Sequence, residues 1–118
     1  MKLSDIGTGT KLELERFDEE GNRIEPNVIS KYERTLEDHE AVIAAPILEG
    51  IVVPIQIGTL LNVYFTCRGG NDIHLFAFSA LVKDRQVCEN LPFIKVEQQG
   101  EIHKIQRREY YRLDCLLK

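Results

Sequence analysis

The residues best suited to chemistry are three arginines near the end of the chain: Arg107, Arg108 and Arg112. A guanidinium is a planar fork that donates two parallel hydrogen bonds, so it binds phosphates and guanine edges well. Arg108 and Arg112 stand four positions apart and share one side of the chain in a helical turn and in an extended segment alike. Both forks can therefore converge on one ligand.

Two aromatic residues lie between these arginines. Tyr110 and Tyr111 can stack on a base or pack this segment onto a neighbouring domain. The plain alternative is a solvated basic stretch close to the end of the chain. The mixture of arginine and tyrosine favours a ligand or domain contact over that alternative.

No other group of residues indicates an active site. His39, His74 and His103 are scattered, without metal-ligand spacing to a cysteine or carboxylate. The chain has no nucleophile elbow, no phosphate-binding glycine loop and no zinc-protease helix motif. The acidic run 18–20 is interpreted as a solvated turn, with a metal-binding loop as the weaker alternative. We expect no catalysis, no metal and no cofactor.

Composition narrows the class of protein. The 118 residues are enough for one domain, or one domain and a tail. A net charge of −4 argues against a general nucleic-acid binder but allows a small phosphorylated ligand at a local basic cluster. No apolar run approaches the roughly 20 residues of a membrane span. The three cysteines, an odd number at wide spacing, are interpreted as free thiols of a cytoplasmic protein: Cys67, Cys88 and Cys115.

The elements that must position the arginines are strands. Residues 11–17 alternate apolar and polar without a fault, which predicts a strand with one buried and one wet face. Residues 18–22 and 68–72 have turn composition, and the second is expected to close a plain hairpin. No window has a convincing helical stripe. The strands expected along the chain are 11–17, 28–36, 41–45, 51–55, 60–67, 73–83 and 91–96.

Short strands joined by tight turns predict an all-β antiparallel barrel or sandwich. The 41–45 strand is apolar on both faces, and the proline in 51–55 places that segment at an edge or a bend. Residues 102–105 are interpreted as a connector that leads out of the barrel into the arginine segment.

The chain resembles the PilZ-type cyclic di-GMP receptors, and more closely the N-terminal barrel of flagellar brake proteins. The final motif is the specific part of this resemblance, and the other residues form a general barrel pattern. The residues concerned are Ile6-Gly7, Ala45-Pro46 through Gly50, Val53-Pro54-Ile55, Gly58, the strand from Phe76 to Val82, and Ile105-Gln106-Arg107-Arg108-Glu109-Tyr110-Tyr111-Arg112.

This resemblance implies an antiparallel split barrel of six to seven strands with a C-terminal linker tail. Residues 1–102 would form the barrel. Residues 103–118 would form the linker and the start of a PilZ domain. The implied ligand is cyclic di-GMP, bound by Arg107, Arg108 and Arg112 on one side and by a PilZ-domain motif, Asp/Asn-x-Ser-x-x-Gly, on the other. The implied partners are the PilZ domain in cis and a flagellar motor or stator protein.

The second motif is not in this sequence, which stops at Lys118. We therefore expect a fragment of a longer protein, and no detectable cyclic di-GMP binding by the fragment alone. Two alternatives remain open from the sequence. One is a flavin-binding split-barrel oxidoreductase. The other is a structural interaction domain whose basic tail contacts an acidic partner.

Overall fold

The computed structural model describes residues 1–105 of the 118, and the regular secondary structure of this part is almost entirely strands. A single 3-10 turn, η1 (Leu3–Asp5), precedes them. Within these residues no helix is long and apolar enough to cross a membrane. The strands are β1 (Lys11–Phe17), β2 (Arg23–Glu37), β3 (Glu40–Ala44), β4 (Ile47–Leu48), β5 (Ile51–Val52), β6 (Leu60–Gly69), β7 (Asp72–Cys88), β8 (Leu91–Gln98) and β9 (His103–Ile105).

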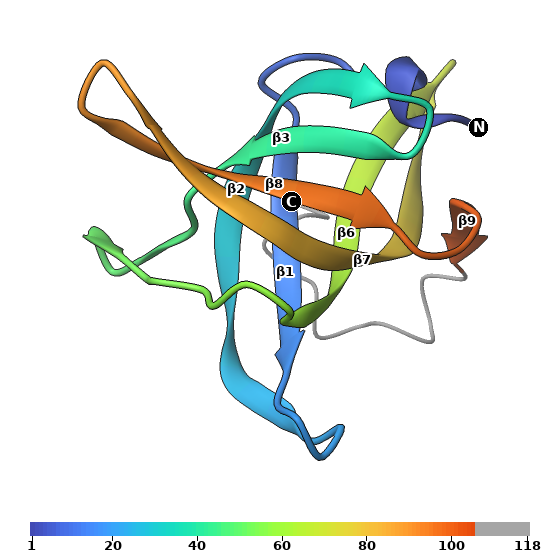
Figure 1. Ribbon diagram of the computed structural model, residues 1–118. Helices are drawn as coiled ribbons and strands as arrows, with labels where there is room; N and C mark the ends of the chain where they lie inside the picture. The colour runs from blue at the N-terminus through green and yellow to red at the C-terminus, as the bar shows by residue number, and fades with distance from the viewer. Residues whose placement is uncertain (106–118) are drawn as a thin grey trace.

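Six of the strands form a closed ring. They pair in the order β1-β6-β7-β8-β3-β2, and β2 pairs back onto β1 (Figure 1). Every pairing is antiparallel. This arrangement confirms the predicted all-β antiparallel fold and is consistent with a split barrel. The β4–β5 hairpin lies outside the ring, where β4 pairs with β2. The 51–55 segment is therefore at an edge of the sheet, as its proline indicated.

The core fills the inside of the ring, where alternate residues of each strand point. Leu12 and Leu14 of β1 are fully buried, and so are Leu61, Val63 and Phe65 of β6. These are the residues that period-two alternation assigns to the inner face. Three consecutive residues of β3, Ala41 to Ile43, are buried, which confirms the strand predicted to be covered on both faces.

Strand β7 is longer than expected. Over residues 72–81 it pairs with β6, and beyond a register shift between Val82 and Asp84 it continues with β8 to Cys88. The β7–β8 hairpin extends away from the ring as an arm (Figure 1). The sequence concealed this arm because residues 83–88 are exposed and mostly polar, and no apolar alternation marks them.

The segment expected to lead out of the barrel is itself part of the sheet. β9 pairs with β7, with Ile105 opposite Leu75 and His103 opposite Ala77. Ile102 and Ile105 are 8% and 5% exposed. Burial of two isoleucines favours pairing over a free connector, so the connector interpretation is wrong for residues 103–105. The division into two domains at residue 102 stays a prediction.

Candidate functional site

The arginines that the sequence analysis singled out, Arg107, Arg108 and Arg112, lie outside the described residues, as do Tyr110 and Tyr111. The structure does describe the surface from which the chain enters that segment. Ile105, two positions before Arg107, is held by β9 on the edge of β7. The candidate site is therefore built from the outer face of the ring beside β9.

A small apolar cluster holds Ile105 on that outer face. It consists of Tyr64, Leu75, Ala77 and Ile105, each no more than 5% exposed. Tyr64 of β6 stands opposite Ala77 of β7, and Leu75 stands opposite Ile105. Since directly paired residues of a sheet share a face, this cluster lies on one side of three adjacent strands. It is separate from the core inside the ring.

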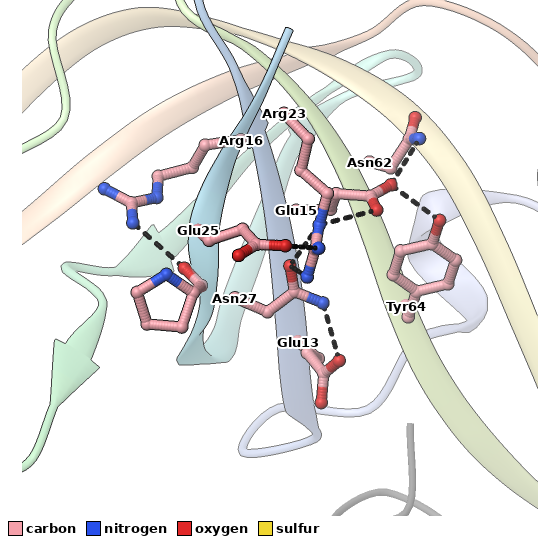
Figure 2. Close-up of polar contacts among 9 residues, drawn as sticks. Glu13, Glu15, Arg16, Arg23, Glu25, Asn27, Asn62 and Tyr64 are labelled. Carbon is pink, nitrogen blue, oxygen red and sulfur yellow. Dashed lines mark hydrogen bonds and ion pairs between the residues drawn. The ribbon is translucent and has the colours of Figure 1, made fainter. Parts of the chain in front are cut away.

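Next to this cluster, on β1, the carboxylate of Glu15 accepts several hydrogen bonds (Figure 2). The hydroxyl of Tyr64 and the amide nitrogen of Asn62 each donate to its Oε1 at 3.0 Å. The Nε of Arg23 lies 3.2 Å from its Oε2. A carboxylate with this many donors is held in one orientation, since each bond to the charged group adds to the cost of turning it.

The network continues along β2 through Arg23. Its Nη1 lies 2.7 Å from Oε1 of Glu25, and its Nη2 donates to Oδ1 of Asn27 at 2.9 Å. Asn27 in turn donates its Nδ2 hydrogen to Oε2 of Glu13 at 2.9 Å. We call this surface the acidic face and define it by Glu13, Glu15, Glu25, Arg23 and Asn27 (Figure 2).

The acidic face corrects one expectation from the sequence. The alternation of β1 assigned Glu13 to a wet face, but Glu13 is only 3% exposed. A charged side chain is rarely buried unless polar groups satisfy it. Nothing in the local sequence announces this burial. The one available signal is the spacing of Glu13 and Glu15, which places both carboxylates on the same side of one strand.

A second feature is an open cavity of about 1170 Å³ at one end of the ring, lined by the β1–β2 turn and residues 54–60. Arg16 lines it and donates from Nη2 to the carbonyl oxygen of Pro26 at 3.0 Å, while its Nε is buried without a hydrogen-bond partner. Burial lowers the pKa of this guanidinium from its ordinary value. Asp18, Glu19 and Glu20 also line the cavity and offset the positive charge, so the cavity presents no single sign of charge.

The remaining candidates behave as ordinary structure. Asp18 accepts the backbone N–H groups of Glu20 and Asn22 at 2.9 and 2.8 Å, which confirms the predicted turn at 18–22. Gly70, at φ +62°, lies in the short turn of the β6–β7 hairpin predicted for 68–72. Cys67 and Cys88 carry free thiols. Across residues 1–105, no group of three histidine, cysteine or acidic side chains could hold a metal ion.

The known proteins to which this chain is similar are described as proteins of flagella or motility. The family model PilZNR, described as "Flagellar protein YcgR", matches residues 7–98. Among solved structures, the inhibitor of motility from Bacillus subtilis (MotI/DgrA) is similar with a TM-score of 0.66 and 26% sequence identity. The alignment covers 88% of this chain but 48% of that one, so this chain spans about half the length of that structure. No curated protein sequence matches the chain.

Proposed function

Because this chain belongs to the PilZNR family, described as flagellar protein YcgR, we propose that it is a non-catalytic regulatory domain of a cytoplasmic protein that controls flagellar motility. The observation that carries the proposal is the family match over residues 7–98, which contain all six strands of the ring. The similarity to a Bacillus subtilis inhibitor of motility supports it. That structure is about twice as long, so the ligand and the partners of the whole protein belong to the proposal.

The proposed ligand is cyclic di-GMP, bound jointly by Arg107, Arg108, Arg112 and a PilZ domain that follows this chain. The spacing of the arginines supports this ligand, because paired guanidinium forks suit phosphates and guanine edges. The anchoring of Ile105 also supports it, since the chain enters the arginine segment from a fixed point on β7. The family match ends at residue 98, before these arginines.

The proposed mechanism is a charged hinge between two domains. Without ligand, three clustered guanidinium groups repel one another. When the dinucleotide binds, its phosphates neutralise that charge, and the two domains adopt a new relative orientation. A motor or stator protein would read the new orientation. No bond is made or broken in this scheme.

The test is Arg108→Ala in a protein that joins this chain to its PilZ domain. Loss of a charge-assisted hydrogen-bond pair should weaken cyclic di-GMP binding about 10- to 100-fold in calorimetric titration, while the unfolding midpoint stays unchanged. The matched control is Arg85→Ala, an exposed arginine on the β7–β8 arm, which should bind as the parent does. Parental affinity in Arg108→Ala would refute the role of this arginine.

The non-catalytic part of the proposal has a separate test. A split-barrel oxidoreductase would hold a flavin, and its purified solution would absorb visible light in the flavin band. We expect a colourless protein. A flavin spectrum at one flavin per chain would contradict the non-catalytic role and favour an oxidoreductase.

A further inference from the structure

We propose that the open edge of β7 at residues 72–74 binds residues 106–108 of this same chain as a continuation of β9. Asp72 then forms an ion pair with Arg108 when no nucleotide is bound. The pairing itself rests on sheet register, the open edge and charge. Its consequence for regulation rests on the proposed function, because Arg108 would have to leave Asp72 to bind the dinucleotide.

One edge of β7 is left open in the described part of the chain. On one side, residues 72–81 of β7 pair with β6. On the other side, β9 covers residues 75–77, and β8 covers β7 from Ala80 onward. Within residues 1–105, no strand pairs with this second side over residues 72–74. An open strand edge carries backbone N–H and C=O groups that a further strand can pair with.

The register of β9 assigns a partner on this edge to each residue that follows it. Ile105 stands opposite Leu75, and it is held there at 5% exposure by their common apolar cluster. In an antiparallel pair, one strand advances by a residue as its partner recedes by one. The next pairs in this register are Gln106 with His74, Arg107 with Ile73 and Arg108 with Asp72. No chain has to cross the surface of the ring, because this segment follows Ile105 directly.

Asp72 is placed to accept a cation on this edge. Its neighbour on β6 is Gly69, which has no side chain. The ring of His74 lies over Gly69, since a Cβ added there would be 3.2 Å from its Cδ2. Asp72 is exposed, and no residue among 1–105 forms an ion pair with it. A residue opposite Asp72 on the open edge would have its Cβ about 4.5–5.5 Å away, where an opposite charge stabilises the pair.

Arg107 would lie on the other face of the sheet, beside Ile73, which is 37% exposed. The methylene groups of an arginine can cover such a side chain while the guanidinium stays in water. Arg68 stands opposite Ile73 on β6, so two strand spacings, about 10 Å, would separate the two arginines. Physiological salt largely screens exposed charges at that distance. Their repulsion therefore does not prevent the pairing.

The pairing would compete with the nucleotide for Arg108. A guanidinium paired with Asp72 directs its hydrogen bonds to a carboxylate of this domain, and those donors are then lost to a phosphate or a guanine edge. The apparent affinity for the nucleotide falls with the fraction of molecules in the paired state. Asp72 would thus raise the nucleotide concentration at which the protein responds.

The first test measures the register on the 118-residue chain without any nucleotide. All three cysteines are replaced by serine, and His74→Cys is combined with Gln106→Cys. Residues directly opposite in a sheet have Cα atoms about 4.5–5.5 Å apart, which a disulfide can bridge, so oxidised glutathione should cross-link this pair. The control combines His74→Cys with Arg107→Cys. It should cross-link more slowly, because the side chain at 107 would point to the opposite face.

Equal cross-linking rates for positions 106 and 107 would overturn the proposal, because an unpaired segment brings both to residue 74 with similar frequency. If His74→Cys lowers the thermal midpoint, Ile73→Cys with Arg107→Cys tests the same register from the other face.

The ion pair is tested by adding Asp72→Asn to the chain with cysteines at 74 and 106. Loss of an opposite-charge cross-strand pair should slow cross-linking about two- to fivefold. The matched control is Asp84→Asn, an exposed aspartate on the β7–β8 arm, which should leave the rate unchanged. An unchanged rate in Asp72→Asn would show that Asp72 does not hold Arg108.

The second test uses the protein that joins this chain to its PilZ domain, titrated with cyclic di-GMP in a calorimeter. Asp72→Asn should bind about two- to fivefold more tightly than the parent, and Asp84→Asn should bind as the parent does. If the parent binds no dinucleotide, the proposed function fails, and cross-linking still decides whether the pairing occurs. If the parent and Asp72→Asn bind equally well, the pairing does not compete with the ligand and the inference about regulation is wrong.

Discussion

Tyr64 donates its hydroxyl hydrogen to Glu15 at 3.0 Å, and it belongs to the apolar cluster that includes Ile105. One side chain on β6 therefore bonds to the acidic face and is part of the cluster that buries Ile105 of β9. Its position follows from register, since Tyr64 stands opposite Glu13 on one side and Ala77 on the other.

Removal of the hydroxyl by Tyr64→Phe should lower the free energy of unfolding by about 1.5–3 kcal/mol, the range for a hydrogen bond to a charged group. Urea denaturation measures this loss. In a Glu15→Gln background the same substitution should cost less, because the charged acceptor is gone. Equal costs in both backgrounds would show that the charge of Glu15 adds nothing to this hydrogen bond.

Substitution by alanine should lower the free energy of unfolding far more on the inner face of β1 than on the β7–β8 arm. Leu14 is fully buried inside the ring, so Leu14→Ala should lower the free energy of unfolding by about 2–5 kcal/mol. Leu91, on β8 in the arm, is 59% exposed, and Leu91→Ala should stay within about 0.5 kcal/mol of the parent. Chemical denaturation measures both losses, and equal losses would contradict a core that lies inside the ring.

Two glycines give opposite expectations for substitution by alanine. Gly58 has φ +94° and donates its N–H to Val82, so Gly58→Ala should cost about 1–2 kcal/mol of stability. At Gly100 an added Cβ meets only open space and φ lies outside the left-handed region, so Gly100→Ala should stabilise by about 0.4–1 kcal/mol. Similar thermal midpoints for the two variants would contradict the backbone geometry.

Alkaline stability should depend on Tyr32, which is 2% exposed. Burial raises the pKa of its hydroxyl above the ordinary 10.0, and the hydrogen bond with Thr35 acts in the opposite direction. Below about pH 10 both folded and unfolded states keep the proton, so this group adds no pH dependence there. As the pH rises toward the higher folded pKa, the unfolded state ionises first and stability falls.

The matching variant is Tyr32→Phe. At neutral pH it should lose about 1 kcal/mol, the net value of a hydrogen bond. Its stability should then fall less than that of the parent as the pH rises above about 10. Urea midpoints at a series of alkaline pH values measure the difference, and parallel curves would show that Tyr32 has an unperturbed pKa.

The 118-residue chain alone should show no binding of cyclic di-GMP in calorimetric titration. Micromolar affinity needs about 8 kcal/mol, whereas exposed ion pairs contribute about 0–1 kcal/mol each. Three arginines without the PilZ half of the site fall well short of that energy. Micromolar binding by this chain would mean that its own residues supply the missing half.

Several features of the fold were predictable because they are encoded locally. The alternation of residues 11–17 predicted β1 and its inward Leu12 and Leu14, and the glycines of 68–72 predicted the β6–β7 turn. The sequence predicted the candidate site only as a cluster of arginines, which lies outside the described residues and stays a prediction. The network that the structure does describe, from Glu13 to Tyr64, gathers residues of three strands that no local pattern joins.

By itself, the amino-acid sequence determined where most of the strands lie and which residues could bind an anionic ligand, because side-chain alternation, turn residues and charge act over a few positions. Only the tertiary structure decided that β2 closes the ring by pairing with β1, that β7 pairs with β6, β8 and β9, and that Glu13 is buried. Pairing partners depend on how well distant segments bury one another's apolar faces. The total apolar area that these segments bury is defined only when all the strands are paired.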